Sequence, residues 1–109
     1  MFARMATFSV TDPDRAAGMS ERIREAALPV TERLQGWQGA TQMLDRESGK
    51  LAVIHFFDTA ENMEAAEPTF ESMPQQFPED LRQQVQEVAA GRQSIEKYEV
   101  LGEHRSSSG

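Results

Sequence analysis

The feature that most constrains the fold is a hairpin pattern in the middle of the sequence. Two segments of strand character, Trp37–Arg46 and Leu51–Asp58, flank the short polar run Glu47–Lys50. Gly49 in that run can adopt the positive φ that a tight hairpin turn requires. The second segment is almost continuously apolar, which is typical of a strand buried on both faces at the centre of a sheet. The first segment is more polar and suits an edge strand.

Further strands and helices are predicted on both sides of this hairpin from the spacing of apolar residues. They are a strand at Phe2–Val10, a helix from about Ser20 to Gln35, helices from about Ala60 to Ser72 and from about Glu79 to Ala90, and a strand at Ser94–Gly102. Asp12 and Pro13 offer an earlier start for the first helix, because aspartate caps helices and proline suits the first helical position. Gly18 weakens the pattern between the two starts, and Pro29 should kink the helix.

The predicted order of elements is β-α-β-β-α-α-β, which indicates an α+β fold of the ferredoxin-like sandwich type. We expect an antiparallel sheet of strand order 4-1-3-2 with the helices on one face. The opposite face would then expose a large apolar patch. We therefore predict that two copies pack face to face as a dimeric α+β barrel with an enclosed lumen. Residues 1–103 should form this single domain, and 104–109 should be a polar, disordered tail.

Composition excludes several classes of function. The 109 residues include 18 acidic and 11 basic side chains, and the formal net charge of −7 repels phosphate groups. Binding to nucleic acid or to an anionic membrane is therefore not expected. The chain has no cysteine, which excludes disulfides and thiolate chemistry. No signal peptide and no apolar run of about 20 residues is present, so we expect a cytoplasmic protein.

Four short motifs give the sequence a resemblance to a known family. They are Ala27-Leu28-Pro29, Gly36-Trp37-Gln38-Gly39, Asp45-Arg46-Glu47-Ser48-Gly49-Lys50 and Glu96-Lys97-Tyr98-Glu99-Val100. From about Phe2 to Leu101, the chain resembles the antibiotic biosynthesis monooxygenase-like proteins of the dimeric α+β barrel superfamily. The resemblance implies the fold predicted above. It also implies oxidation of aromatic substrates by molecular oxygen, in some members without a cofactor.

Other members of that family cleave haem, and this sequence departs from their pattern. The haem-degrading branch uses an asparagine in the first strand, a tryptophan near the end of the third and a histidine in the following helix. Here Phe2–Val10 contains no asparagine, Phe57 stands at the tryptophan position, and no histidine lies between Thr59 and Ala90. We therefore predict no haem, no other cofactor and no metal.

His55 is the main candidate for a catalytic residue. It lies two residues before Phe57, so both side chains point to the same side of the sheet, and the resemblance implies that this side faces the barrel lumen. The imidazole could act as a general base on a phenolic substrate, because its pKa lies near neutral pH. Alternatively, it is a buried histidine that hydrogen-bonds a backbone carbonyl or a cross-strand partner.

Two further side chains are candidates for contact with a ligand, beside Phe57 as a pocket wall. Arg4 could bind a carboxylate or phenolate, or it could pair with an acid such as Glu99. Tyr98 could donate a hydrogen bond to a substrate, or it could pack its ring and leave its hydroxyl in water. Trp37 is interpreted as a packing anchor at the dimer seam.

Two functional hypotheses follow from the sequence. The first is a homodimer that binds an aromatic or apolar small molecule in its lumen and acts as a cofactor-independent, monooxygenase-like enzyme. In that case His55 would deprotonate the substrate and Arg4 would hold the resulting anion. The second is a non-catalytic module for small-molecule binding or dimerisation, with its own side chains filling the lumen.

Overall fold

The computed structural model describes residues 1–104, apart from the side chain of Gln93. The elements are β1 (Phe2–Val10), α1 (Pro13–Thr31), β2 (Trp37–Asp45), β3 (Lys50–Phe57), α2 (Ala60–Ala65), α3 (Glu67–Ser72), the 3-10 turn η1 (Met73–Gln76), α4 (Glu79–Val88) and β4 (Ala89–Glu99). This confirms the predicted order, with the second predicted helix divided into α2 and α3. Of the predicted tail, 105–109 lie outside the described residues.

The four strands form one antiparallel sheet of order β2-β3-β1-β4. This is the predicted 4-1-3-2 order read from the opposite edge, so the ferredoxin-like fold is confirmed. The β2–β3 hairpin turns where the sequence predicted it, and Gly49 has a φ of 73°. β3 lies inside the sheet and β2 lies at its edge, as their contrasting polarity indicated.

Helix α1 uses the earlier of the two predicted starts. The Asp12 carboxylate accepts a hydrogen bond from the Arg15 backbone N–H at 3.1 Å, and Pro13 is the first helical residue. Gly18 is accommodated inside the helix, at a cost of about 1 kcal/mol relative to alanine. The helix ends at Thr31, so the predicted span from Ser20 to Gln35 was wrong at both ends.

Strand β4 begins earlier than predicted, directly after α4. Ala89 pairs with Val10 at the end of β1, whereas the sequence placed the strand start at Ser94. Two register shifts between β1 and β4 accommodate the additional residues, and Gly91 has a φ of 105°. Gly91, which directly follows the predicted helix of Glu79 to Ala90, therefore lies within an irregular strand, because pairing with β1 overrides the local pattern.

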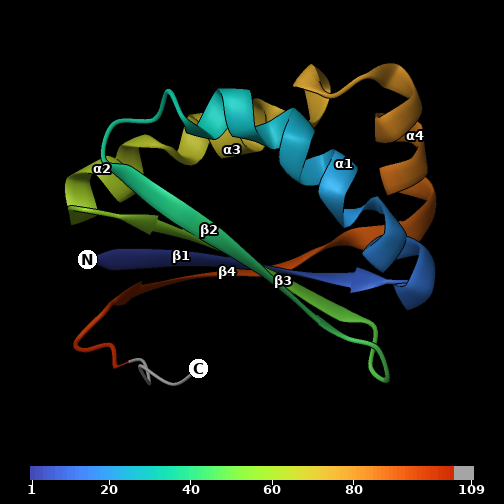
Figure 1. Ribbon diagram of the computed structural model, residues 1–109, viewed down its shortest axis with the longest axis horizontal. Coiled ribbons are helices and arrows are strands. Elements are labelled where there is room, and N and C mark those ends of the chain that lie inside the picture. The colour runs from blue at the N-terminus through green and yellow to red at the C-terminus, as the bar shows by residue number, and fades with distance from the viewer. Residues whose placement is uncertain (105–109) are drawn as a thin grey trace.

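Among residues 1–104, all the helices pack on one face of the sheet and none covers the other face (Figure 1). Two clusters of buried apolar side chains join the helices to the sheet. One is centred on Val10, Met19, Leu81 and Val88, and the other on Phe57, Met63 and Ala66. Within residues 1–104, no helix is both long and apolar enough to cross a membrane.

Candidate functional site

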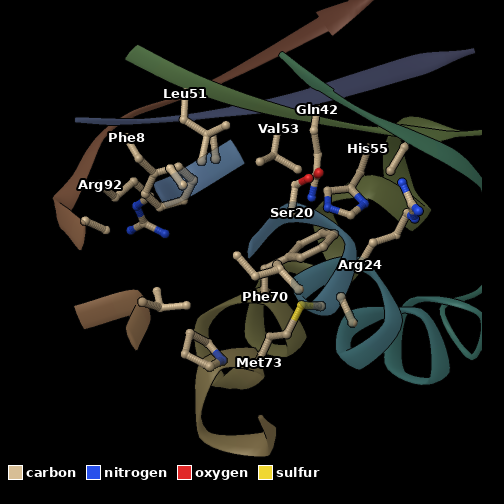
Figure 2. A pocket seen from close by; sticks show the side chains of 18 of the residues that line it. Phe8, Ser20, Arg24, Gln42, Leu51, Val53, His55, Phe70, Met73 and Arg92 are labelled. Atoms are coloured by element: carbon tan, nitrogen blue, oxygen red, sulfur yellow. The ribbon is translucent and has the colours of Figure 1, made fainter. Parts of the chain in front are cut away.

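A cavity of about 980 Å³ lies between the sheet and the helices of a single chain. Its sheet side comes from β1, β2 and β3, and its opposite side from α1, α3 and η1 (Figure 2). Apolar residues line most of it: Ala6, Phe8, Ala16, Ala17, Ile23, Ala27, Leu28, Leu44, Leu51, Val53, Phe70, Met73, Pro74, Phe77 and Val85. A concave apolar site with few polar groups is the usual form of a small-molecule pocket.

His55 faces this cavity and not a space between two sheets. His55 and Phe57 share one side of β3, as predicted, but that side meets the helices. The His55 ring centroid lies 4.6 Å from that of Phe70 in α3. The expectation that His55 faces a lumen on the uncovered side was therefore wrong. Alternation along a strand shows which residues share a face, but not which face the helices cover.

The hydrogen bond to His55 determines which ring nitrogen carries the proton. The indole Nε1–H of Trp37 donates to His55 Nδ1 at 3.1 Å. Since the indole nitrogen can only donate, Nδ1 must be an acceptor, and the proton of the neutral ring lies on Nε2. No described residue forms a hydrogen bond with Nε2. Every fully buried side-chain nitrogen or oxygen of the described residues has a hydrogen-bond partner, so Nε2 cannot be fully buried. Nε2–H is therefore accessible from the cavity.

The surroundings of His55 favour the neutral ring. The side chain is buried, and this burial, followed by the positive charge of Arg4, lowers the pKa of His55 to about 4. Removal from water disfavours the charged form of an imidazole, and a neighbouring cation disfavours it further. At neutral pH His55 is thus an uncharged hydrogen-bond donor that points into an apolar space.

Arg4 lies beside His55 but is already paired. Its guanidinium contacts the Glu67 carboxylate, with Nε to Oε1 at 2.5 Å and Nη2 to Oε2 at 3.3 Å. The guanidinium also lies over the Phe70 ring, 4.2 Å from its centroid. The hydrogen bond from Arg4 lowers the pKa of Glu67. An ion pair was one of the two predicted roles for Arg4, but the expected partner, Glu99, was wrong.

Trp37 contributes to the site, which the sequence interpretation missed. Trp37 pairs with Phe57 across the hairpin. The next paired residue of the strand is Gly39, which faces Phe56, so β2 has one additional residue at this point. A bulge of this kind redirects side chains, and here Trp37 reaches the helix side of the sheet beside His55. The glycine at position 39 is the residue in the sequence that could have indicated this bulge, and its φ in the structure is 142°.

The other two candidates do not line the cavity. Phe57 is fully buried and packs in the core cluster with Met63 and Ala66, so it supports the wall from behind. Tyr98 pairs with Ala3 on the uncovered side of the sheet, and its hydroxyl contacts Glu96 at 2.6 Å. The structure therefore brings together Arg4 and His55 but not Phe57 and Tyr98.

Polar side chains from several elements complete the lining. Figure 2 shows Ser20 and Arg24 of α1 and Gln42 of β2 on the same side of the cavity as His55. Arg92 of β4 lies beside Phe8 elsewhere in the cavity, and its guanidinium is 3.6 Å from Glu71. Residues 1–104 contain no group of three potential metal ligands from His, Asp or Glu. The site can therefore offer hydrogen-bond donors and positive charge inside an apolar pocket.

Comparison with known proteins relates this chain to uncharacterised sequences. No protein-family model matches it. Two uncharacterised proteins of Mycobacterium tuberculosis, MT2634 and Rv2557, are each 26% identical to it over 105 residues. The match covers 96% of this chain but 43% of those proteins. The chain thus spans less than half the length of the curated relatives it matches.

Comparison with solved structures supports the fold. MhuD from Mycobacterium tuberculosis, a haem degrader solved with two haems in its active site, matches with a TM-score of 0.68 at 16% identity, over 96% of this chain and 100% of that chain. A dimeric ferredoxin-like protein from an uncultured marine organism matches with a TM-score of 0.63 at 13% identity, over 97% and 100%.

SnoaB from Streptomyces nogalater, a cofactor-independent oxygenase, matches with a TM-score of 0.57 at 11% identity, over 94% of each chain. Antibiotic biosynthesis monooxygenase-like proteins are also among the matching structures. The resemblance to these ferredoxin-fold proteins is therefore confirmed at the level of the fold.

Proposed function

We propose that this protein binds an aromatic or apolar small molecule in the cavity between its sheet and its helices, and oxidises it as a cofactor-independent, monooxygenase-like enzyme. The observation that carries the proposal is the unpartnered Nε2–H of the buried residue His55, which is accessible from an apolar cavity of about 980 Å³. A donor in that position favours a ligand with an oxygen acceptor, such as a phenolate or a quinone carbonyl.

His55 acts in this proposal as a hydrogen-bond donor and not as the general base suggested by the sequence. Its accessible nitrogen already carries a proton, and its pKa of about 4 makes it a weak base at neutral pH. A fixed N–H in a desolvated site stabilises negative charge that develops on a ligand oxygen. Phe70, whose ring lies against His55, offers an aromatic surface on which a planar ligand can stack.

The cofactor-independent form of the proposal is supported by the donor set and by SnoaB, whose fold the chain shares. MhuD holds haem, but this cavity does not fit an iron ligand. A ligating histidine needs a lone pair toward the metal and donates its other N–H to a neighbour. His55, the one histidine among the described lining residues, has the reverse arrangement, because its Nδ1 accepts from Trp37.

The test uses Trp37, the single tryptophan of the chain, as a probe within the cavity wall. Quenching of its fluorescence by naphthols and hydroquinones measures binding, and an oxygen electrode measures turnover. His55→Leu removes the donor and should weaken binding by about tenfold, or roughly 1.4 kcal/mol. His55→Gln keeps an amide donor and serves as the matched control. Equal affinity of all three proteins would overturn the role of His55.

A non-catalytic binding module is the second candidate. The open cavity disfavours the version in which the protein's own side chains fill the binding space. The paired state of Arg4 favours a module without turnover, because Glu67 already satisfies the cation proposed to hold a reacting anion. Tight binding of aromatic ligands without oxygen consumption would identify this second function. Oxygen consumption that depends on ligand would exclude it.

We also propose that the chain forms a homodimer through the uncovered face of the sheet. That face carries Met5, Ile54 and Phe56 at alternate positions of β1 and β3, with Met43 and Tyr98 about half exposed on the edge strands. Exposed apolar patches of this extent mark protein interfaces. Light scattering should give twice the chain mass of 12.2 kDa. A monomer at micromolar concentration would contradict the proposal.

A further inference from the structure

One of the arginines that line the cavity has no ion-pair partner among the described residues, unlike the others. Four arginines and one acid, Glu71, contribute to its lining. Three of the arginines have carboxylate partners: Arg4 pairs with Glu67, Arg46 with Asp14, and Arg92 with Glu71. The fourth, Arg24 of α1, has no hydrogen bond or ion pair with any of the described residues. Arg24 is exposed to solvent and lines the cavity, so the lining carries one positive charge that no described residue neutralises.

This unpaired charge contrasts with the composition of the chain. Acidic side chains outnumber basic ones by 18 to 11, and Glu21 and Glu25 lie close to Arg24 in the helical sequence. Neither of these carboxylates lies within ion-pair distance of it. A guanidinium is a planar donor that suits carboxylates in a two-point arrangement. An exposed cation that lines the cavity is therefore available to a ligand.

Arg24 also lies near the other free donors of the cavity. Figure 2 shows it on the same side as His55 and Gln42, while Leu51, Phe8 and Arg92 lie together on the other side of the view. The Gln42 side chain makes no hydrogen bond within residues 1–104. One part of the cavity thus offers a charged donor and two neutral donors, and the rest offers apolar surface.

We propose that the ligand of this cavity is an aromatic carboxylic acid, with its carboxylate held by Arg24 and its ring system held between the sheet and Phe70. This inference rests on the proposed function and specifies the class of molecule that the same cavity takes. In it, Gln42 and the His55 N–H donate to the remaining oxygen atoms of the ligand. Arg24 is a specificity residue, which selects the anionic form over a neutral molecule of the same shape.

The experiment compares 2-naphthoate with methyl 2-naphthoate, which has the same ring system but no charge. Isothermal titration calorimetry with the full chain measures both affinities. We expect the acid to bind the protein roughly fivefold to tenfold more tightly than the ester, and Arg24→Gln to abolish that preference. Arg24→Lys should restore part of it, and added salt should weaken binding of the acid alone.

Arg33→Gln is the matched control for loss of a positive charge. Arg33 is exposed just beyond α1, has no side-chain partner within residues 1–104, and does not line the cavity. The Arg33→Gln substitution should leave the affinities for 2-naphthoate and for its methyl ester unchanged. Equal binding of acid and ester by the unmodified protein, or an Arg24→Gln variant that keeps the preference, would overturn the inference while the aromatic pocket stands. Failure of both ligands to bind would overturn the proposed function together with it.

Discussion

Burial of His55 predicts a specific dependence of stability on pH. Its pKa is about 4 in the folded protein and 6.5 as a model value for the unfolded chain. Between these values the unfolded state binds more protons, so the stabilisation is fully present above pH 6.5 and is lost as the pH falls toward 4. At about 1.4 kcal/mol per pH unit, a change from pH 7 to pH 5 should remove about 2 kcal/mol of the free energy of unfolding.

Urea unfolding followed by the fluorescence of Trp37 measures this loss directly. The matched control is His55→Gln, which removes the titrating group but keeps a side chain that can accept from the indole. Its stability should change by much less over the same interval. His104, the other histidine, is exposed and is present in both proteins. Parallel curves for the two proteins between pH 7 and pH 5 would refute the argument that His55 is buried as the neutral ring.

Three further perturbations test the site and the fold. Trp37→Phe removes the donor to Nδ1 and should shift His55 toward the Nδ1–H tautomer in nitrogen-15 NMR spectra, whereas a constant tautomer would show that the indole does not set it. Arg4→Met removes the two hydrogen bonds to Glu67 and leaves Lys97, 3.5 Å away, as the remaining cation beside that carboxylate. It should destabilise the protein by about 2 kcal/mol in chemical unfolding, and unchanged stability would show that the pair contributes nothing. Gly49→Ala should lower the melting temperature, because φ is 73° and the added Cβ would lie 2.7 Å from a backbone oxygen. Gly18→Ala should raise the melting temperature, because Gly18 lies within a helix and an added Cβ would meet no atom within 4 Å.

The fold could be predicted well because its signals are local. The hairpin needed only a polar turn with Gly49 between two segments of different polarity, and the structure has both strands within one residue of their predicted bounds. The less accurate boundaries are those that distant contacts decide. β4 extends back to Ala89 because β1 offers a pairing partner, and a single-sequence pattern contains no information about that partner.

The candidate site could be predicted only in part, because its geometry depends on the helices. The sequence showed that His55 is buried and shares a face with its neighbours two positions away. It could not show that Glu67, 63 positions along the chain from Arg4, would hold the guanidinium against Phe70. Trp37 was interpreted as a packing anchor, and it does pack against the Phe57 cluster, but it also lines the cavity. The bulge after Trp37 directs its side chain there, and the sequence pattern alone did not show that bulge.

The net charge of the chain is another sequence property that does not describe the site. A charge of −7 describes the field far from the molecule and argues against polyanionic partners. It does not describe a cavity, where screening is weak and a few nearby groups dominate. Four arginines and a single acid line this one, and three of those arginines are paired with carboxylates, so the positive charge left for a small anion is that of Arg24. An acidic composition that argues against nucleic-acid binding is therefore compatible with a small acidic ligand in the cavity. Substitution of Arg24 tests the binding of that ligand and has little effect on the net charge of the chain.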